Sequence, residues 1–278
     1  MTLQQALRAA VLQLQAAGFE DASRDARRLL AAAMVWDMHK LTLEGQAQVP
    51  PDAQARFDAM IAKRIDFVPV SQIIGGRLFF GRWFTVTRDV LDPRPDTETL
   101  IEIALDEPFT EVLDLGTGSG AIVITLLSER PEAQGVGTDL SADALDVAAS
   151  NAVHLVDRIT LVASDWFASV EGEFDLIVSN PPYIALGEMD DLQPEVRLHE
   201  PRMALTDEAD GLMAYRQITQ DAPAHLTPGG RLIFEIGPTQ AVAVVDLMVA
   251  AGFERIRVVP DLDGRDRVVV GYKPAIAA

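Results

Sequence analysis

From residue 111 onward, short apolar segments alternate with stretches of helical periodicity. Strands buried on both faces read as continuous apolar runs, and their alternation with helices predicts a parallel, doubly wound sheet in an α/β fold. We expect strands at 111–115, 134–138, 158–163, 174–179, 230–236, 253–258 and 266–272, and helices at about 119–129, 141–153, 211–224 and 238–250. Only a short loop around Asp261–Arg265 joins the last two strands, which predicts an antiparallel pair in a seven-stranded, mostly parallel sheet.

The first quarter of the chain has helical periodicity without strands. Thr2 and Gln5 have the spacing of a capping box, a second helix begins at Asp21 or Ser23, and a third begins near Pro51. These signals predict a small helical bundle at 1–75, which carries no chemical constellation and is interpreted as a substrate-recognition domain. Two short apolar runs around Gly81 predict a β-hairpin linker at 76–90. The α/β domain then occupies 91–278, and its first helix runs from Pro95 or Asp96 to Leu105.

Composition limits the chemistry that the chain can perform. There is no cysteine, so disulfides, thiolate metal sites and cysteine nucleophiles are excluded. The four histidines are scattered without ligand spacing, so no metal is expected. The first residues lack the basic start and apolar run of a signal peptide, and no long uncharged apolar run follows, so we expect a cytoplasmic protein without membrane attachment.

The net charge of −19 is unevenly distributed. Residues 1–75 hold eight basic and eight acidic residues, so the entire net charge resides in 76–278. An acidic field of this kind repels phosphate backbones and argues against direct nucleic-acid binding. Acidity that serves only solubility is the alternative interpretation.

The stretch Asn180-Pro181-Pro182-Tyr183 follows the predicted strand 174–179. Because proline keeps the residue before it out of the helical region, Asn180 and Pro181 are both expected to be extended. Neither proline has an N–H, so no adjacent donor competes for the carbonyl oxygens of these two residues. A rigid group of acceptors beside an aromatic ring suits a flat, neutral –NH2 group. The alternative is an ordinary turn at the end of a strand.

Three other predicted strands also end in polar or glycine-rich residues. The turn Gly116–Gly120 has the spacing G-x-G-x-G, which differs from the G-x-G-x-x-G of dinucleotide-binding folds. Asp139 can accept both hydroxyls of a ribose, and Asp165 with Trp166 suits an adenine amino group and its ring face. Taken singly, Asp139 could instead cap the helix near Ser141, and Trp166 could belong to the core. Because the carboxyl ends of parallel strands meet at one edge, the four elements converge on one crevice, and their order favours S-adenosylmethionine over NAD.

These motifs resemble those of the class I S-adenosylmethionine-dependent methyltransferases, and within them the protein-(glutamine-N5) methyltransferases that modify peptide chain release factors. The resemblance covers essentially the whole chain. The Asn-Pro-Pro-Tyr element is shared with enzymes that methylate amino groups of DNA and RNA, whereas Pro93–Glu98 and the helical first domain narrow the match. The motifs that carry the resemblance are Pro93–Glu98, Asp114–Gly120, Ser179–Ile184, Glu195-Val196, Glu200-Pro201, Asp210–Leu212, Tyr215-Arg216, Glu235–Gly237 and Asp261–Gly264.

The resemblance implies a Rossmann-like methyltransferase domain at 91–278 and a role for each motif. It implies that S-adenosylmethionine is bound by Gly116, Thr117, Gly118, Ser119, Gly120, Asp139, Trp166 and Asn180. It also implies that the substrate glutamine, in the Gly-Gly-Gln loop of class 1 peptide chain release factors, is bound by Asn180, Pro181, Pro182 and Tyr183. Asn180, Pro181 and Tyr183 are then the catalytic residues, with two oxygens accepting the amide hydrogens and Tyr183 packing on the amide plane.

Two other functions remain open at the level of the sequence. A nucleic-acid amino methyltransferase would use the same residues on adenine or cytosine, but it predicts a basic face. A non-catalytic regulator that binds the cofactor would not need an intact acceptor set. We expect the protein to act as a monomer on a protein substrate.

Some residues near the predicted site have open roles. Arg94 and Glu98 lie about one helical turn apart and could form an ion pair, orient the loop or touch substrate. The segment His199–Arg202 could cover the site or be an ordinary loop. Asp92 and Asp207–Ala209 depart from the family pattern without touching the predicted acceptors.

Overall fold

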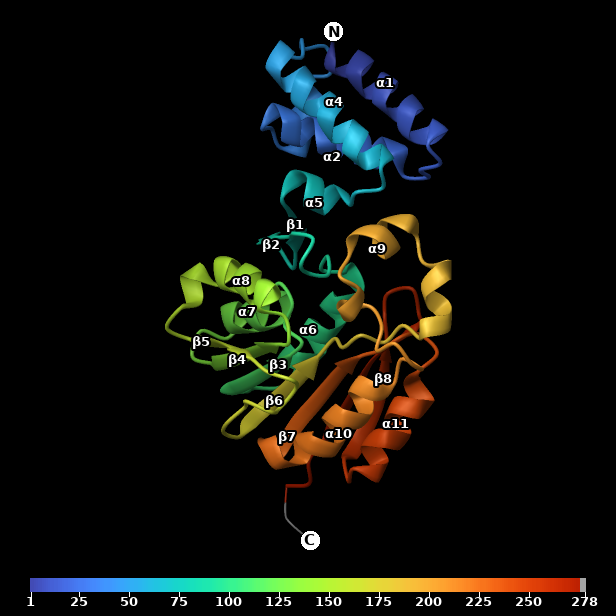
Figure 1. Ribbon diagram of the computed structural model, residues 1–278. Helices are drawn as coiled ribbons and strands as arrows, with labels where there is room; N and C mark the ends of the chain where they lie inside the picture. Colours follow the sequence, from blue (N-terminus) through green and yellow to red (C-terminus); the bar gives the residue numbers. More distant parts are fainter. Residues whose placement is uncertain (276–278) are drawn as a thin grey trace. The chain divides into compact units, whose positions relative to one another are not determined.

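The computed structural model describes residues 1–275 and divides into two compact units (Figure 1). The first unit, which is helical, contains Met1–Gly76 and also Gln193–His199. The second unit contains Arg77–Leu192 and the chain from Glu200 onward. The sequence pattern did not suggest that a segment near residue 195 would group with the first helices.

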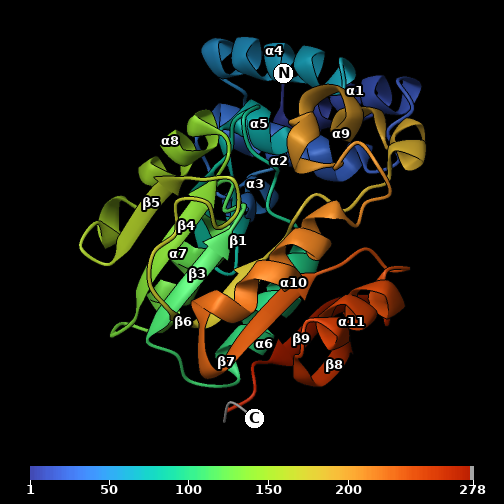
Figure 2. The same cartoon turned by 60° about the horizontal axis from the view of Figure 1, so that its bottom comes forward.

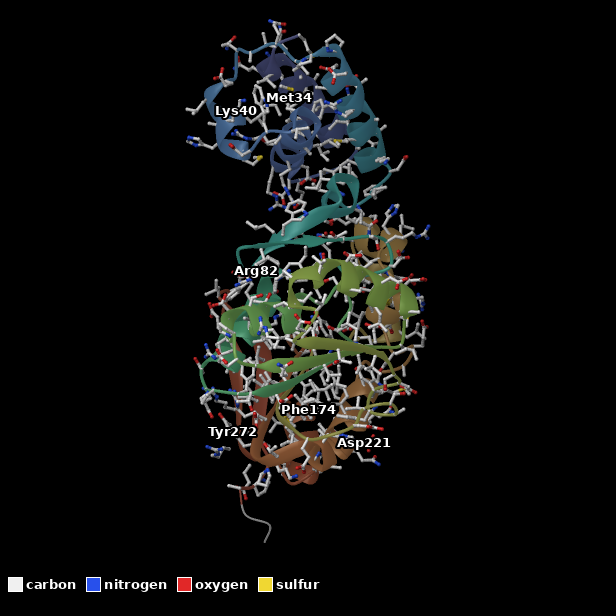
Figure 3. All side chains as sticks on the ribbon, turned by 90° about the vertical axis from the view of Figure 1, so that its left-hand side faces the viewer. Met34, Lys40, Arg82, Phe174, Asp221 and Tyr272 are labelled. Carbon is white, nitrogen blue, oxygen red and sulfur yellow. The ribbon has the colours of Figure 1, made fainter. Side chains whose placement is uncertain are left out.

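The helical unit is built around a cluster of apolar side chains from its longer helices. Its helices are α1 (Leu3–Ala16), α2 (Ala22–Met34), α3 (Met38–Leu43), α4 (Pro51–Ile65), α5 (Val70–Ile74) and α9 (Pro194–His199). The predicted capping box is present, because Thr2 Oγ1 accepts from the Gln5 N–H and Gln5 Oε1 accepts from the Thr2 N–H. The six-residue α3 and the five-residue α5 were not predicted, since helices this short show no periodicity. Lys40 of α3 is exposed and lies 4.3 Å over the Trp36 ring (Figure 3).

One buried arginine joins three parts of the helical unit. The Arg64 side chain of α4 pairs with Asp25 of α2 at 2.8 Å and with Glu195 of α9. Its guanidinium carbon lies 4.2 Å from the centre of the Phe19 ring. A buried arginine needs such partners, and this one ties α9 to the helices of the first 76 residues.

The second unit contains the predicted seven-stranded sheet, in the order β5-β4-β3-β6-β7-β9-β8 (Figure 2). Its strands are β3 (Glu111–Leu115), β4 (Gln134–Asp139), β5 (Ile159–Ala163), β6 (Phe174–Ser179), β7 (Leu226–Glu235), β8 (Glu254–Pro260) and β9 (Asp266–Tyr272). The pairs from β5 to β7 are parallel, and β9 is antiparallel to both neighbours. The predicted Rossmann-like α/β fold is therefore confirmed, including the antiparallel last pair.

Helices cover both faces of the sheet because alternate residues of the central strands point to opposite sides. Val112 and Leu176 belong to a cluster with α6 and α7, whereas Leu113 and Ile177 belong to a cluster with α10 and α11 (Figure 2). The helices of this unit are α6 (Glu98–Leu105), α7 (Ala121–Glu129), α8 (Ala142–Asn151), α10 (Met213–His225) and α11 (Ala241–Ala250). Within residues 1–275, no helix has the length and apolar character needed to cross a membrane.

The predicted β-hairpin consists of β1 (Gly76–Phe79) and β2 (Arg82–Thr85). Asn151, the last residue of α8, accepts from the Thr85 N–H and donates to the Thr85 carbonyl. Arg82, labelled in Figure 3, pairs with Glu129 of α7 at 2.6 Å. The hairpin is therefore attached to the two helices that follow β3 and β4.

A buried arginine of β7 holds the end of α6. Arg231 is 3% exposed and donates to the carbonyls of Ile103, Ala104 and Glu107 at 3.0–3.4 Å. Carbonyls at the last turn of a helix have no partner within the helix, and a cation there also interacts favourably with the helix dipole.

We predict that Arg231→Leu destabilises the second unit by about 2–4 kcal/mol, because it leaves buried carbonyls without donors. Urea denaturation of the full chain measures this change. Arg257→Leu is the matched control, since Arg257 is about half exposed and lies 3.6 Å from Asp106; the control should change stability by less than about 0.5 kcal/mol. Equal effects of the two substitutions would contradict the assigned role of Arg231.

Candidate active site

The pairing of β3 with β6 places the glycine turn beside the Asn-Pro-Pro-Tyr stretch. Leu115, the last residue of β3, pairs with Ser179, the last residue of β6. The buried Ser179 hydroxyl donates to the Leu115 carbonyl at 2.7 Å. Gly116 and Asn180 therefore begin at the same level of the sheet, at its carboxyl edge.

A cavity of about 460 Å³ lies at this edge. Its lining includes most of the predicted site residues, namely Gly116, Thr117, Gly118, Ser119, Asp139, Asp165, Trp166, Asn180 and Pro182. Gly120, Pro181 and Tyr183 are not among the lining residues. Each of the four predicted elements thus contributes at least one residue to the lining of this cavity, although three of the predicted residues do not line it.

The glycine turn needs glycine for two different reasons. Gly116 has φ +72°, and a Cβ there would be in ordinary contact with the Trp166 ring at 3.8 Å. Gly120 has φ +79°, and its Cβ would lie 2.7 Å from Ile124 Cδ1 of α7. The backbone conformation therefore favours glycine at both positions, and at Gly120 the absence of a Cβ also leaves room for the first turn of α7.

Asp139 is held by backbone donors on both of its oxygens. The Gly118 N–H donates to Oδ2 and the Ser141 N–H donates to Oδ1, each at 2.9 Å. The Ser141 hydroxyl accepts from the Ala144 N–H, so Ser141 and not Asp139 caps α8. The alternative role of Asp139 as a helix cap is therefore wrong. Each oxygen keeps further acceptor capacity, and Asp139 lines the cavity.

Trp166 lies between the core and the cavity. It is half-buried, packs against the core cluster of α10 and α11, and also lines the cavity. Its φ of +47° is in the left-handed region, which a large side chain seldom adopts. Such backbone strain points to a constraint on where the ring must lie. Trp166 therefore belongs to both the core and the cavity wall.

Asn180 presents an acceptor that has no partner within the described residues. Its Nδ2 donates to Thr97 Oγ1 at 3.5 Å, whereas no described group donates to its Oδ1. Thr97 lies at the start of α6, and nothing in its local sequence indicated this contact. Pro182 lines the cavity and Pro181 is buried.

The Tyr183 ring packs against the core cluster rather than the cavity. Burial, followed by the nearby Glu235 carboxyl, raises the pKa of Tyr183 to about 12. Gln240 donates to the carbonyls of Tyr183 and Gly211 at 2.9 and 3.1 Å, and accepts from the Gly237 N–H. Gln240 and Gly211 are thus supporting residues that sequence reasoning did not find, although Gly211 lies in one of the quoted family motifs.

The proposed pair of Arg94 with Glu98 is wrong. Arg94 donates to both oxygens of Glu200 at 2.7 Å, and Glu98 accepts from the Phe80 N–H at 2.9 Å. Arg94 lines the cavity, as do Pro201 and Arg202 just after Glu200. The segment that begins at Glu200 is therefore part of the cavity wall, held in place by Arg94.

The two departures from the family pattern have structural roles. Asp92 is buried and pairs with Arg77 of the hairpin at 2.9 Å. Asp207 accepts from three N–H groups, those of Ala209, Gly211 and Met213, and so fixes the turn that precedes α10.

Two carboxyl groups lie buried beneath the site. Burial raises the pKa of Asp114 to about 7, against hydrogen bonds from Thr117 and the Val123 N–H that favour the charged form. Burial also raises the pKa of Glu235 to about 7, against a hydrogen bond from Thr97 and the nearby charge of Arg267. Both side chains are protonated near neutral pH more readily than exposed carboxyls.

The raised pKa of Asp114 predicts a pH dependence of stability. The folded protein retains a proton on Asp114 that the unfolded chain releases near its ordinary pKa of 3.8. The free energy of unfolding that this group contributes therefore falls as the pH rises from about 4 to about 7. The free energy of unfolding of Asp114→Asn, measured relative to wild type, should rise by on the order of 1–4 kcal/mol between about pH 4 and about pH 7. At higher pH this difference should stay constant. Urea denaturation at stepped pH measures the difference, with Glu132→Gln at an exposed position as control; a difference independent of pH would refute the assignment.

Gly211 tests the support of the Asn-Pro-Pro-Tyr stretch. A Cβ at Gly211 would lie 2.3 Å from the Tyr183 carbonyl oxygen, and its φ is +75°. Gly252 has φ +84° but nothing within 4 Å of a Cβ, so it separates the steric clash from the backbone strain. We predict that Gly211→Ala costs at least about 2 kcal/mol more than Gly252→Ala, because backbone atoms must shift. Thermal unfolding compares the variants, and equal losses would show that the clash is relieved.

Comparisons with known proteins agree with this architecture. The family model described as PrmC N-terminal domain matches residues 5–75, and the model described as Methyltransferase small domain matches residues 88–260. Among solved structures, a methyltransferase from Pyrococcus furiosus has a TM-score of 0.56 at 17% identity and covers 77% of this chain and 99% of its own. That likeness shows the shared fold.

Curated relatives match along nearly the whole chain. A release factor glutamine methyltransferase of Cereibacter sphaeroides is 60% identical over 272 residues, which cover 97% of this chain and 98% of the relative. A release factor glutamine methyltransferase of Agrobacterium fabrum is 41% identical, with 96% of each chain covered. With this identity over both units, the chain belongs to the release factor glutamine methyltransferase family.

Proposed function

We propose that the protein transfers a methyl group from S-adenosylmethionine to the side-chain amide nitrogen of the glutamine in the Gly-Gly-Gln motif of class 1 peptide chain release factors. The names of its relatives support this substrate. The observation that carries the proposal is the Asn180 side chain, whose Oδ1 has no donor among the described residues while its Nδ2 donates to Thr97.

The size and lining of the cavity support S-adenosylmethionine as the cofactor. Its volume of about 460 Å³ falls within the usual range of small-molecule sites. Asp139 offers acceptors for ribose hydroxyls, Asp165 and Trp166 offer an acceptor and a ring face for adenine, and the glycine turn offers backbone close to the ligand. When bound, S-adenosylmethionine supplies an electrophilic methyl group on a sulfonium.

The substrate side of the site has to orient a poor nucleophile. An amide nitrogen has a delocalised lone pair, so correct placement against the methyl group matters more than a strong base. In this proposal Asn180 Oδ1 and the Pro181 carbonyl oxygen accept the two hydrogens of the glutamine amide. Their dipoles also stabilise the positive charge that develops on nitrogen, and the extra proton leaves to water.

Tyr183 and Pro182 have supporting roles in this proposal. Pro182 lines the cavity, where its ring can limit the space beside the amide. The Tyr183 carbonyl is held by Gln240, and its ring packs in the core. Tyr183 thus supports the glutamine site by fixing the stretch that contains Asn180.

The helical unit and the charge of the chain bear on the partner. We assign residues 1–75 to recognition of the release factor, because the unit offers no cavity residues to the site. The excess of acidic residues in 76–278 favours a protein substrate over DNA or RNA. We further propose that the protein works as a cytoplasmic monomer without a metal.

Two substitutions separate the roles of the two sides of the cavity. We predict that Asn180→Ala lowers kcat by at least about 100-fold, because the amide loses an oriented acceptor, while the Kd for S-adenosylmethionine changes by less than about threefold. Asp139→Ala should do the reverse and chiefly raise that Kd. Calorimetric titration and single-turnover methylation measure the two quantities. A wild-type kcat in Asn180→Ala would contradict the proposed mechanism. An unchanged Kd for S-adenosylmethionine in Asp139→Ala would show that Asp139 does not bind the ribose.

The substrate is tested by locating a transferred label. The protein is incubated with labelled S-adenosylmethionine and a class 1 release factor, and separately with DNA and with RNA. Label is expected only on the glutamine of the Gly-Gly-Gln motif, and a release factor carrying Gln→Asn at that position is the control. Label on a nucleic acid would favour an amino methyltransferase, and no label on any of the three would favour a non-catalytic binder.

A further inference from the structure

We propose that Asn151, the last residue of α8, is a positioning residue that fixes two parts of the cavity wall and so keeps the cavity ready for S-adenosylmethionine. The inference rests on the proposed function, since it concerns how the site for that cofactor is held in shape. Asn151 does not line the cavity itself. Its side chain instead bonds the glycine turn, which lines the cavity, and the end of β2, which leads into a second lining segment.

The Asn151 amide uses its oxygen and both of its nitrogen-bound hydrogens. Its Oδ1 accepts from the Thr85 N–H at 2.8 Å. Its Nδ2 donates to the Thr85 carbonyl at 3.1 Å and to the Ser119 carbonyl at 2.9 Å. A turned amide would set Oδ1 against two carbonyl oxygens and Nδ2 against an N–H group, so only the observed orientation satisfies these contacts. One side chain therefore links two backbone segments in a defined geometry.

The bond to Ser119 gives the glycine turn a donor from another part of the chain. Ser119 lies before α7, outside the helix. The Val123 N–H, four residues later, donates to Asp114 Oδ2 at 3.3 Å rather than to the Ser119 carbonyl. Among the residues that the structure describes, Asn151 is the donor to this carbonyl. The Ser119 peptide group is therefore held by a side chain of α8.

Such a bond matters in a turn that is rich in glycine. Gly116, Gly118 and Gly120 all have positive φ, and glycine has more alternative conformations than any other residue. Fixing these residues for ligand binding therefore costs more conformational entropy than fixing others. Where only a fraction of the molecules has the turn in its binding conformation, the apparent Kd rises in inverse proportion to that fraction. The Asn151 bond raises this fraction before the cofactor arrives.

The bonds to Thr85 position a second part of the cavity wall. Thr85 is the last residue of β2, and residues 89–91 line the cavity shortly after it. Val90, within that lining segment, is buried in a cluster with Val147 of α8. Val147 and Asn151 are four residues apart, so they lie on the same face of α8. This face therefore holds the segment at its start, through hydrogen bonds, and at the cavity, through apolar packing.

Two substitutions of Asn151 separate the donors of the amide from its acceptor. Asn151→Asp keeps the shape of the side chain and an acceptor for the Thr85 N–H, but an ionised carboxylate cannot donate to either carbonyl. At pH 8 it should raise the Kd for S-adenosylmethionine by at least about tenfold. KM for the release factor, measured at saturating S-adenosylmethionine, should change by less than about threefold. Asn151→Ala removes the acceptor as well and should raise the same Kd by at least about fivefold.

Ser150→Ala is the matched control. Ser150 is the exposed neighbour of Asn151 on α8, and its hydroxyl donates to the Asp146 carbonyl of the same helix at 3.0 Å. Its Kd for S-adenosylmethionine should stay within about twofold of wild type. Calorimetric titration gives the Kd of each variant, and thermal unfolding shows that each variant is folded.

Backbone amides report on the two wall segments without any ligand. In nitrogen-labelled protein, Asn151→Asp should shift the N–H resonances of Gly118 and Gly120 while hydrogen exchange at the Thr85 N–H stays as slow as in wild type. Asn151→Ala should shift the same glycine resonances and also speed exchange at Thr85, because the acceptor is lost.

The inference is overturned if both variants bind S-adenosylmethionine within about twofold of wild type, or if KM for the release factor rises as much as this Kd. If Asn151→Ala does not fold, Asn151→Asp decides, because it keeps the shape of the side chain. A wild-type protein that methylates no release factor would instead defeat the proposed function, and the binding and resonance measurements would still decide the role of Asn151.

Discussion

The site depends above all on the register between β3 and β6. Leu115 pairs with Ser179, and the Ser179 hydroxyl donates to the Leu115 carbonyl in a fully buried position. A slip of one residue would turn every side chain of β6 to the other face, which the buried apolar clusters on both faces forbid. The glycine turn after Leu115 and the Asn-Pro-Pro-Tyr stretch after Ser179 are therefore neighbours because of the core, and not because of contacts within the site itself.

Carboxyl groups around this edge behave differently because their surroundings differ. Asp139 accepts from two backbone N–H groups and lines the cavity, so its oxygens are ordered and accessible. Asp114 and Glu235 are removed from water, which raises the pKa of each to about 7. The difference is one of access to water and to the cavity. Thr117 donates its hydroxyl hydrogen to Asp114, whereas the Oε2 atom of Glu235 has no hydrogen-bond partner among the described residues.

The elements that could be predicted are those whose signal is local. The strands 111–115, 174–179 and 266–272 have the bounds that their apolar runs indicated. The meeting of the strand ends in one cavity follows from parallel topology alone. The partners of Arg94 and Thr97 could not be predicted, because Glu200 and Asn180 lie 106 and 83 residues away and only tertiary packing selects them. The five-residue α5 just before Gly76 was not predicted, because it is too short for its periodicity to show.

The path of the chain between the Asn-Pro-Pro-Tyr stretch and α10 connects the two units more than once. After Leu192 the chain enters the helical unit, where Glu195 pairs with Arg64, and it returns at Glu200. The His199 ring forms a hydrogen bond with the Asp66 carbonyl, and the His199 carbonyl accepts from the Gln72 side chain. His199, the last residue before the return, is therefore anchored in the helical unit. Both carboxylate oxygens of Glu200, the next residue, accept hydrogen bonds from Arg94 of the cavity wall. One covalent bond therefore separates a residue fixed by the helical unit from a residue fixed at the cavity.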